Sequence, residues 1–288
     1  MSARNVEAKS EAGAARRVVT VVRGLPTSDG AGVSLTRMIG TRELPDLDPF
    51  LMLDEFGSDK PGDYLAGFPS HPHRGFETVT YMLAGRMRHA DNKGHAGLLT
   101  PGSVQWMTSG RGIVHSEMPE QEEGLMQGFQ LWVNLPAKDK MTAPRYQEFA
   151  PEKIPVVTPA SGVTVKVIAG VVDGVAGPIS AVATDPTYLD IGLAPGASYA
   201  HALPKEHNAF VSVFEGAVTI DGKTVERGQL AVLSQGERVE VTAGDRSARA
   251  ILVAGQPLRE PVAKYGPFVM NTPQEIHQAI ADFQAGKF

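Results

Sequence analysis

The sequence predicts an all-β protein with two strand-rich domains in tandem, followed by one terminal helix. Short runs of β-branched and aromatic residues recur along the chain, and glycine or proline separates them at close spacing. This pattern is typical of β-sandwiches and β-barrels. Glycine (31) and proline (21) are abundant among the 288 residues, and only the end of the chain has a convincing helical period.

The first domain is expected over residues 16–140, after a small, polar, alanine-rich segment over residues 1–15 that is predicted to be a disordered tail. Its clearest strands are predicted at 18–22, 76–83 and 129–134. The last of these alternates apolar and polar residues, which is the period of a half-buried strand.

A connector with five prolines, from Pro136 to Pro159, marks the domain boundary, and the second domain is expected over residues 141–256. Asp221-Gly222 between two short apolar runs is a strong signal for a tight hairpin. The strands of this domain are predicted at 163–168, 210–214, 218–220, 224–225, 230–233, 239–241 and 250–254.

The remaining residues, 257–288, are expected to return as a tail and a helix. Thr272 and Glu275 have the spacing of a capping box, and Pro273 suits the first helical position. The apolar residues that follow make one stripe and are Ile276, Ala279, Ile280 and Phe283. A single amphipathic helix needs a partner, so we expect it to lie across one of the β domains.

Composition excludes several classes of function. The chain has no cysteine, which excludes disulfides, cysteine-ligated zinc, iron–sulfur clusters and cysteine nucleophiles. The formal net charge of −5 argues against direct binding of nucleic acid. No apolar run approaches the roughly 18 residues that span a membrane. The first 17 residues lack the apolar core of a secretory signal, so a cytoplasmic protein is expected.

Two pairs of side chains have the spacing of a metal site. His71 and His73 stand two residues apart, as do His115 and Glu117. On an extended strand such residues point to the same face, so each pair can reach one ion. Imidazole and carboxylate without thiolate suit Fe(II), Mn, Ni or Cu. The alternative is that these histidines form surface or hydrogen-bonded pairs without a metal.

Five segments of the chain closely resemble the pirins, which belong to the cupin superfamily. The segments are residues 48–56 (DPFLMLDEF), 71–81 (HPHRGFETVTY), 101–117 (PGSVQWMTSGRGIVHSE), 131–135 (LWVNL) and 267–272 (PFVMNT). Pirins are bicupins, in which two jelly-roll barrels face each other and the N-terminal barrel holds one metal ion, typically iron. The resemblance implies that His71, His73, His115 and Glu117 are the ligands, the same four residues that the spacing selects.

Glu77 requires a separate interpretation. In the general cupin pattern a glutamate at this place is a ligand, whereas in pirins the carboxylate ligand comes two residues after the third histidine. We therefore favour Glu117 as the ligand. Glu77 is expected to accept a hydrogen bond behind the ligands or to pair with Arg74.

The other candidate residues receive structural interpretations. Internal alignment of the two domains places no ligand residue in the second barrel, so it is expected to be metal-free. His201 and His207 are expected to be structural or surface residues, and Trp106 to fill the core. His89 and His95 flank a turn-like segment and are expected to be solvated.

The resemblance implies two classes of function. Some pirins resemble quercetin 2,3-dioxygenases, which open the central ring of flavonols with O₂ and release CO. In that case a flavonol-like aromatic substrate would bind the metal, and Glu117, or Glu77 if it is not a ligand, would take its hydroxyl proton. The alternative is a metal- or redox-sensing regulatory protein that binds a protein partner through a surface near Arg74 and Arg111. A cupin that only retains the metal would have neither activity.

Overall fold

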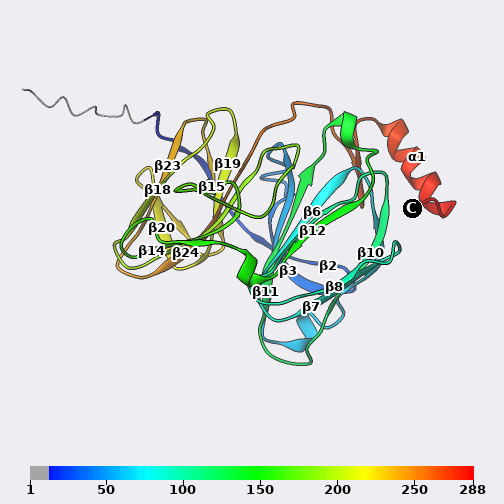
Figure 1. The fold of residues 1–288 in the computed structure, drawn as a ribbon, viewed down its shortest axis with the longest axis horizontal. Coiled ribbons are helices and arrows are strands. Elements are labelled where there is room, and N and C mark those ends of the chain that lie inside the picture. The colour runs from blue at the N-terminus through cyan, green and yellow to red at the C-terminus, as the bar shows by residue number, and fades with distance from the viewer. Residues whose placement is uncertain (1–12) are drawn as a thin grey trace, which may run out of the picture.

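The computed structural model describes residues 13–288, which form two β-barrels side by side, a terminal hairpin and one α-helix (Figure 1). Each barrel consists of a seven-stranded and a four-stranded antiparallel sheet. The predicted all-β class, with two tandem β-barrels and one C-terminal helix, is confirmed. Within residues 13–288 no helix is long and apolar enough to cross a membrane.

The N-terminal barrel carries its larger sheet in the order β12-β9-β6-β11-β4-β3-β2 and its smaller sheet in the order β5-β10-β7-β8. The larger sheet contains β2 (Leu25–Asp29), β3 (Val33–Ile39), β4 (Phe50–Ser58), β6 (Phe76–Ala84), β9 (Val104–Thr108), β11 (Met126–Asn134) and β12 (Arg145–Phe149). The smaller sheet contains β5 (Phe68–His73), β7 (Met87–Asp91), β8 (Ala96–Leu99) and β10 (Ile113–Pro119).

The C-terminal barrel repeats this arrangement, with the orders β1-β22-β19-β24-β17-β14-β13 and β18-β23-β20-β21. The larger sheet contains β1 (Val18–Arg23), β13 (Val156–Val157), β14 (Val163–Ala169), β17 (Thr187–Leu193), β19 (Asn208–Glu215), β22 (Gln229–Leu233) and β24 (Ala248–Gly255). The smaller sheet contains β18 (Ser198–Ala202), β20 (Ala217–Ile220), β21 (Lys223–Glu226) and β23 (Arg238–Ala243). The remaining short elements are β15 (Val171–Val172), β16 (Val175–Ala176), and the single-turn helices at Pro61–Asp63, Ala137–Asp139 and Pro151–Lys153.

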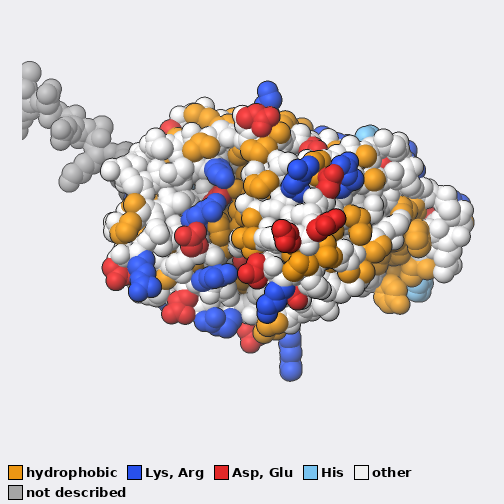
Figure 2. Space-filling model, turned by 90° about the horizontal axis from the view of Figure 1, so that it is seen from below, with side chains coloured by type: hydrophobic (Ala, Val, Ile, Leu, Met, Phe, Trp, Pro, Cys, Tyr) orange, Lys and Arg blue, Asp and Glu red, His pale blue; other side chains and the backbone are white. Residues whose placement is uncertain are grey.

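The two larger sheets pack face to face and share one hydrophobic cluster. Val79, Trp106 and Phe129 from the N-terminal barrel meet Tyr188 and Phe210 from the C-terminal barrel in this cluster. Trp106 is 1% exposed, so the prediction that it fills the core is confirmed. On the face that Figure 2 shows, acidic and basic side chains are interspersed and form no large patch of one sign.

The barrels exchange strands near the predicted boundaries. β1, which opens the predicted first domain, pairs with β22 in the C-terminal barrel. β12 lies beyond residue 140 and pairs with β9 in the N-terminal barrel. The predicted tail over 1–15 lies mostly outside the described residues, but Ala15 bridges to Arg238 and Arg16 is buried.

The C-terminal segment returns to the N-terminal barrel. It forms the hairpin of β25 (Ala263–Tyr265) and β26 (Phe268–Met270), then α1 (Pro273–Gln284). The capping box of Thr272 and Glu275 is present as predicted. Arg74 joins this segment to the barrel through an ion pair with Asp282, at 2.9 Å.

Candidate metal centre

The site lies inside the N-terminal barrel, where β5 and β10 run antiparallel. The register pairs His115 with His71 and Ile113 with His73. Alternation along β5 places His71 and His73 on one face, and the register places His115 opposite His71. One nitrogen atom from each of the three histidines lies within 4.8 Å of the others. The structure thus brings together three of the four predicted ligands.

Several ring nitrogens of the three histidines have no partner among the described residues outside the cluster. His71 Nδ1 lies 2.8 Å from the carbonyl oxygen of Pro69, so in the neutral ring this nitrogen donates and Nε2 keeps its lone pair. This Nε2 lies 3.0 Å from Nε2 of His73. His115 is buried, and neither of its ring nitrogens has a partner. A cation among the three rings supplies the missing partner, so the donor set fits a metal ion.

Electrostatics keep two of the histidines neutral, which is the form that binds a metal. Burial, together with the neighbouring imidazoles of His115 and His71, lowers the pKa of His73 well below its ordinary value. Burial also lowers the pKa of His115 to about 4, although Glu117 opposes this shift.

Glu117 stands beside the cluster on β10. Between His115 and Glu117 the register shifts by a bulge, and Glu117 pairs with Phe68. Its Oε1 accepts a hydrogen bond from Thr80 at 2.9 Å, and its Oε2 accepts one from Gln130 at 3.0 Å. Burial alone would raise the pKa of Glu117, but the two imidazoles and these donors outweigh burial and lower it. The carboxylate is therefore ionised, and its place as fourth ligand stays a prediction.

Glu77 lies on the opposite face of the larger sheet. On β6, Thr80 points to Glu117 inside the barrel, whereas Tyr81 points out and donates to Asp190 of the other barrel at 2.7 Å. Glu77 shares the orientation of Tyr81 and accepts a hydrogen bond from Thr108 at 2.6 Å. The prediction that Glu77 supports the ligands or pairs with Arg74 is therefore wrong.

The structure corrects the interpretation of one further histidine. His89 is 3% exposed on β7, where it pairs across the sheet with Glu117 and its Nε2 contacts the carboxyl group of Glu148. The prediction that it is solvated is wrong. Residues 87–91 alternate between buried and exposed positions along β7, and His89 takes one of the buried ones. His95 is exposed, as predicted, and its Nδ1 lies 3.0 Å from Asp91.

The histidines expected in the second barrel are buried there. His201 is 8% exposed and its Nδ1 lies 2.9 Å from the hydroxyl of Tyr199. His207 is 5% exposed and lies 3.9 Å from Asp185. The sequence left open whether these two histidines are structural or surface residues, and their burial shows that they are structural.

A cavity of about 650 Å³ opens beside His71 and His73. Trp132 and Phe68 give it aromatic walls. Lys264 brings positive charge, with its Nζ 5.4 Å from the ring centroid of Trp132, whereas Arg37 is paired with Asp54 and Asp29. Lys264 comes from the terminal hairpin, far from the histidines in sequence, which is why sequence reasoning missed it.

Comparisons with known proteins identify the family. The model of the Pirin family matches residues 32–133, and that of the Pirin C-terminal cupin domain matches residues 188–288. A Pirin-like protein of Caulobacter vibrioides is 54% identical over 274 residues, 95% of this chain and 99% of that protein. The chain belongs to the pirin family.

Other pirins and solved structures agree with this assignment. Human Pirin is 46% identical over 281 residues, which cover 96% of this pirin and 94% of the human protein. The crystal structure of quercetin 2,3-dioxygenase from Acinetobacter baumannii superposes with a TM-score of 0.88 at 35% identity, covering 96% of this chain and 99% of that one. The Escherichia coli pirin YhhW, solved with nickel(II), shares the fold at 19% identity and a TM-score of 0.65, covering 83% of this chain and 99% of that one.

Proposed function

We propose that this pirin is a metal-dependent dioxygenase of the quercetin 2,3-dioxygenase type, which opens the central ring of flavonols with O₂ and releases CO. One observation carries the proposal: three clustered imidazoles, with ring nitrogens that have no described partner outside the cluster, border a cavity with aromatic walls. The 35% identical neighbour named as a quercetin 2,3-dioxygenase supports the same reaction.

The metal site of the proposal consists of His71, His73 and His115, with Glu117 as fourth ligand. Fe(II) is the metal we favour, and Mn, Ni or Cu suits the same donors. The chemistry that a bound divalent ion supplies is Lewis-acid activation of a substrate hydroxyl, whose pKa it lowers.

The protein's own groups then bind the substrate and receive its proton. Trp132 and Phe68 offer flat apolar surface to an aromatic ring. Glu117 is held ionised by Thr80 and Gln130, so it is placed to accept the proton of the substrate hydroxyl. Arg37 is paired with Asp54 and Asp29, so Lys264 is the basic residue left in the lining to attract an anionic oxygen of the substrate.

Oxygen consumption with quercetin tests the proposal. The metal-free protein would be reloaded separately with Fe(II), Mn, Ni and Cu, and O₂ uptake and CO release would be recorded. We expect turnover with at least one metal and none in His115→Ala, which controls for oxidation by free metal. Confirmed loading without flavonol-dependent O₂ uptake for any metal would contradict the proposal.

The regulatory alternative has weaker support. Arg74, expected on the interaction surface, is only 3% exposed and is occupied by Asp282 and by the carbonyl oxygen of Arg111. The side chain of Arg111 remains exposed. Identical protein partners for the Fe(II) and Fe(III) forms in a pull-down would exclude this alternative. The cytoplasmic location stays a prediction.

A further inference from the structure

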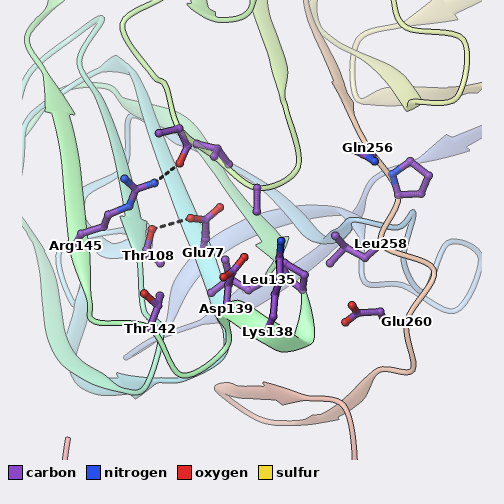
Figure 3. Close-up of a pocket in the computed structure, with 15 residues that line it drawn as sticks. Glu77, Thr108, Leu135, Lys138, Asp139, Thr142, Arg145, Gln256, Leu258 and Glu260 are labelled. Carbon is purple, nitrogen blue, oxygen red and sulfur yellow. Dashed lines mark hydrogen bonds between the residues drawn. The ribbon is translucent and has the colours of Figure 1, made fainter.

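A second cavity, of about 660 Å³, lies between the two barrels (Figure 3). Glu77 and Thr108 line it from the N-terminal barrel, while Leu258 and Glu260 line it from the returning C-terminal segment. Because Glu77 points away from the histidine cluster, this cavity is separated from the metal centre by the larger sheet of the first barrel.

Glu77 is an incompletely partnered carboxyl group in this wall. It is 2% exposed. Thr108 donates to its Oε1, but its Oε2 has no hydrogen-bond partner among the described residues. Burial raises the pKa of Glu77, although Thr108 and the nearby indole N–H of Trp106 lower it in part. A buried carboxyl oxygen without a donor is costly in a folded protein, so it favours a ligand that supplies one.

The surrounding charges favour a cationic ligand. Asp139 and Glu260 line the same cavity as Glu77, so it holds three carboxyl groups. Of its two basic residues, Arg145 donates to the carbonyl oxygen of Ala181 and keeps its positive charge, so the carboxyl groups outnumber the cations by one. Lys138 has an exposed side chain and is the only other cation among the lining residues.

We propose that the cavity between the barrels binds a small organic ammonium compound, whose N–H group donates to Glu77 Oε2. Its apolar part packs against Leu135, Val182 and Leu258, which line the same space. The ammonium group provides the missing donor and a counter-charge together, whereas an anion meets repulsion from the three carboxyl groups. This site does not depend on the proposed dioxygenase activity.

Isothermal titration of the metal-loaded protein with phenethylamine tests the proposal, with 3-phenylpropanoate as the anionic counterpart of similar size. We expect phenethylamine to bind and 3-phenylpropanoate not to bind. Glu77→Gln is expected to weaken phenethylamine binding at least tenfold, and Ala183→Trp, which fills the cavity from an exposed position, to abolish it. Glu152→Gln, an exposed carboxyl outside the cavity, controls for general loss of charge.

A parallel titration of His115→Ala separates this site from the metal centre, where an amine can also coordinate. We expect His115→Ala to bind phenethylamine as the wild type does. Binding that disappears in His115→Ala but survives in Glu77→Gln and Ala183→Trp would overturn the proposal. So would an absence of binding to the wild type, or equal binding of the ammonium compound and the carboxylate. None of these results depends on turnover of a flavonol.

Discussion

Removing one hydroxyl group next to the metal centre is expected to weaken metal binding without changing any ligand. Thr80 donates to Glu117 Oε1 at 2.9 Å, and both side chains are buried. Thr80→Val keeps the shape of the side chain but leaves Gln130 as the remaining side-chain donor to that carboxylate. Glu117 then loses part of the support that fixes its orientation and keeps it ionised.

The magnitude follows from the strength of this contact. A hydrogen bond to a charged group contributes about 1.5–3 kcal/mol, and leaving a buried acceptor unsatisfied costs a similar amount. Groups that hold metal ligands in place typically change metal affinity by about 10–100-fold when they are removed. We expect Thr80→Val to weaken metal binding within this range and to destabilise the metal-free protein by about 1–3 kcal/mol.

Competition against a chelator of known affinity measures the first effect, and urea unfolding of the metal-free protein measures the second. Thr78→Val is the matched control, because Thr78 is buried on the same strand and makes no hydrogen bond to Glu117. Equal metal affinity in Thr80→Val, Thr78→Val and the wild type would refute the view that the hydrogen bond from Thr80 orients Glu117 for metal binding.

Three further predictions concern stability. Tyr81→Phe removes a buried hydrogen bond to Asp190 in the other barrel, so the free energy of unfolding measured in urea should fall by about 1.5–3 kcal/mol. An unchanged free energy of unfolding would mean that this hydrogen bond does not stabilise the protein. His115 stays neutral in the folded protein down to pH about 4, whereas in the unfolded chain it takes up a proton near pH 6.5. The metal-free protein should therefore lose up to about 3 kcal/mol as pH falls from about 6.5 to 4, and His115→Gln, compared over the same range, should lose less. Gly75→Ala places a methyl group 2.0 Å from the carbonyl oxygen of Val269, at a φ of +87°, so limited proteolysis should release the C-terminal segment sooner than in the wild type.

The fold class was predictable because its signals are local. Alternation within strands, Asp221-Gly222 at a hairpin and the capping box at Thr272 each depend on neighbouring residues, and each formed as expected. The exchange of β1 and β12 between the barrels depends on partners far away in sequence, and no local pattern specifies it.

The candidate site was predictable to the extent that strand geometry determines it. The period of two residues placed His71 and His73 on one face, but the role of Glu77 depended on which face of β6 looks into the barrel. His89 was misjudged because a short polar segment resembles a turn until its cross-strand neighbours are known. Lys264 reaches the pocket only because the C-terminal hairpin folds back onto the first barrel.

Metal content tests the central claim most directly. Elemental analysis would compare wild type, His115→Ala and Glu77→Gln, purified from parallel cultures and each checked for native thermal unfolding. The account predicts a stoichiometric metal ion in the wild type and in Glu77→Gln, and none in His115→Ala, because Glu77 lies on the other face of the sheet. Metal that persists in His115→Ala, or that is lost in a folded Glu77→Gln, would contradict it.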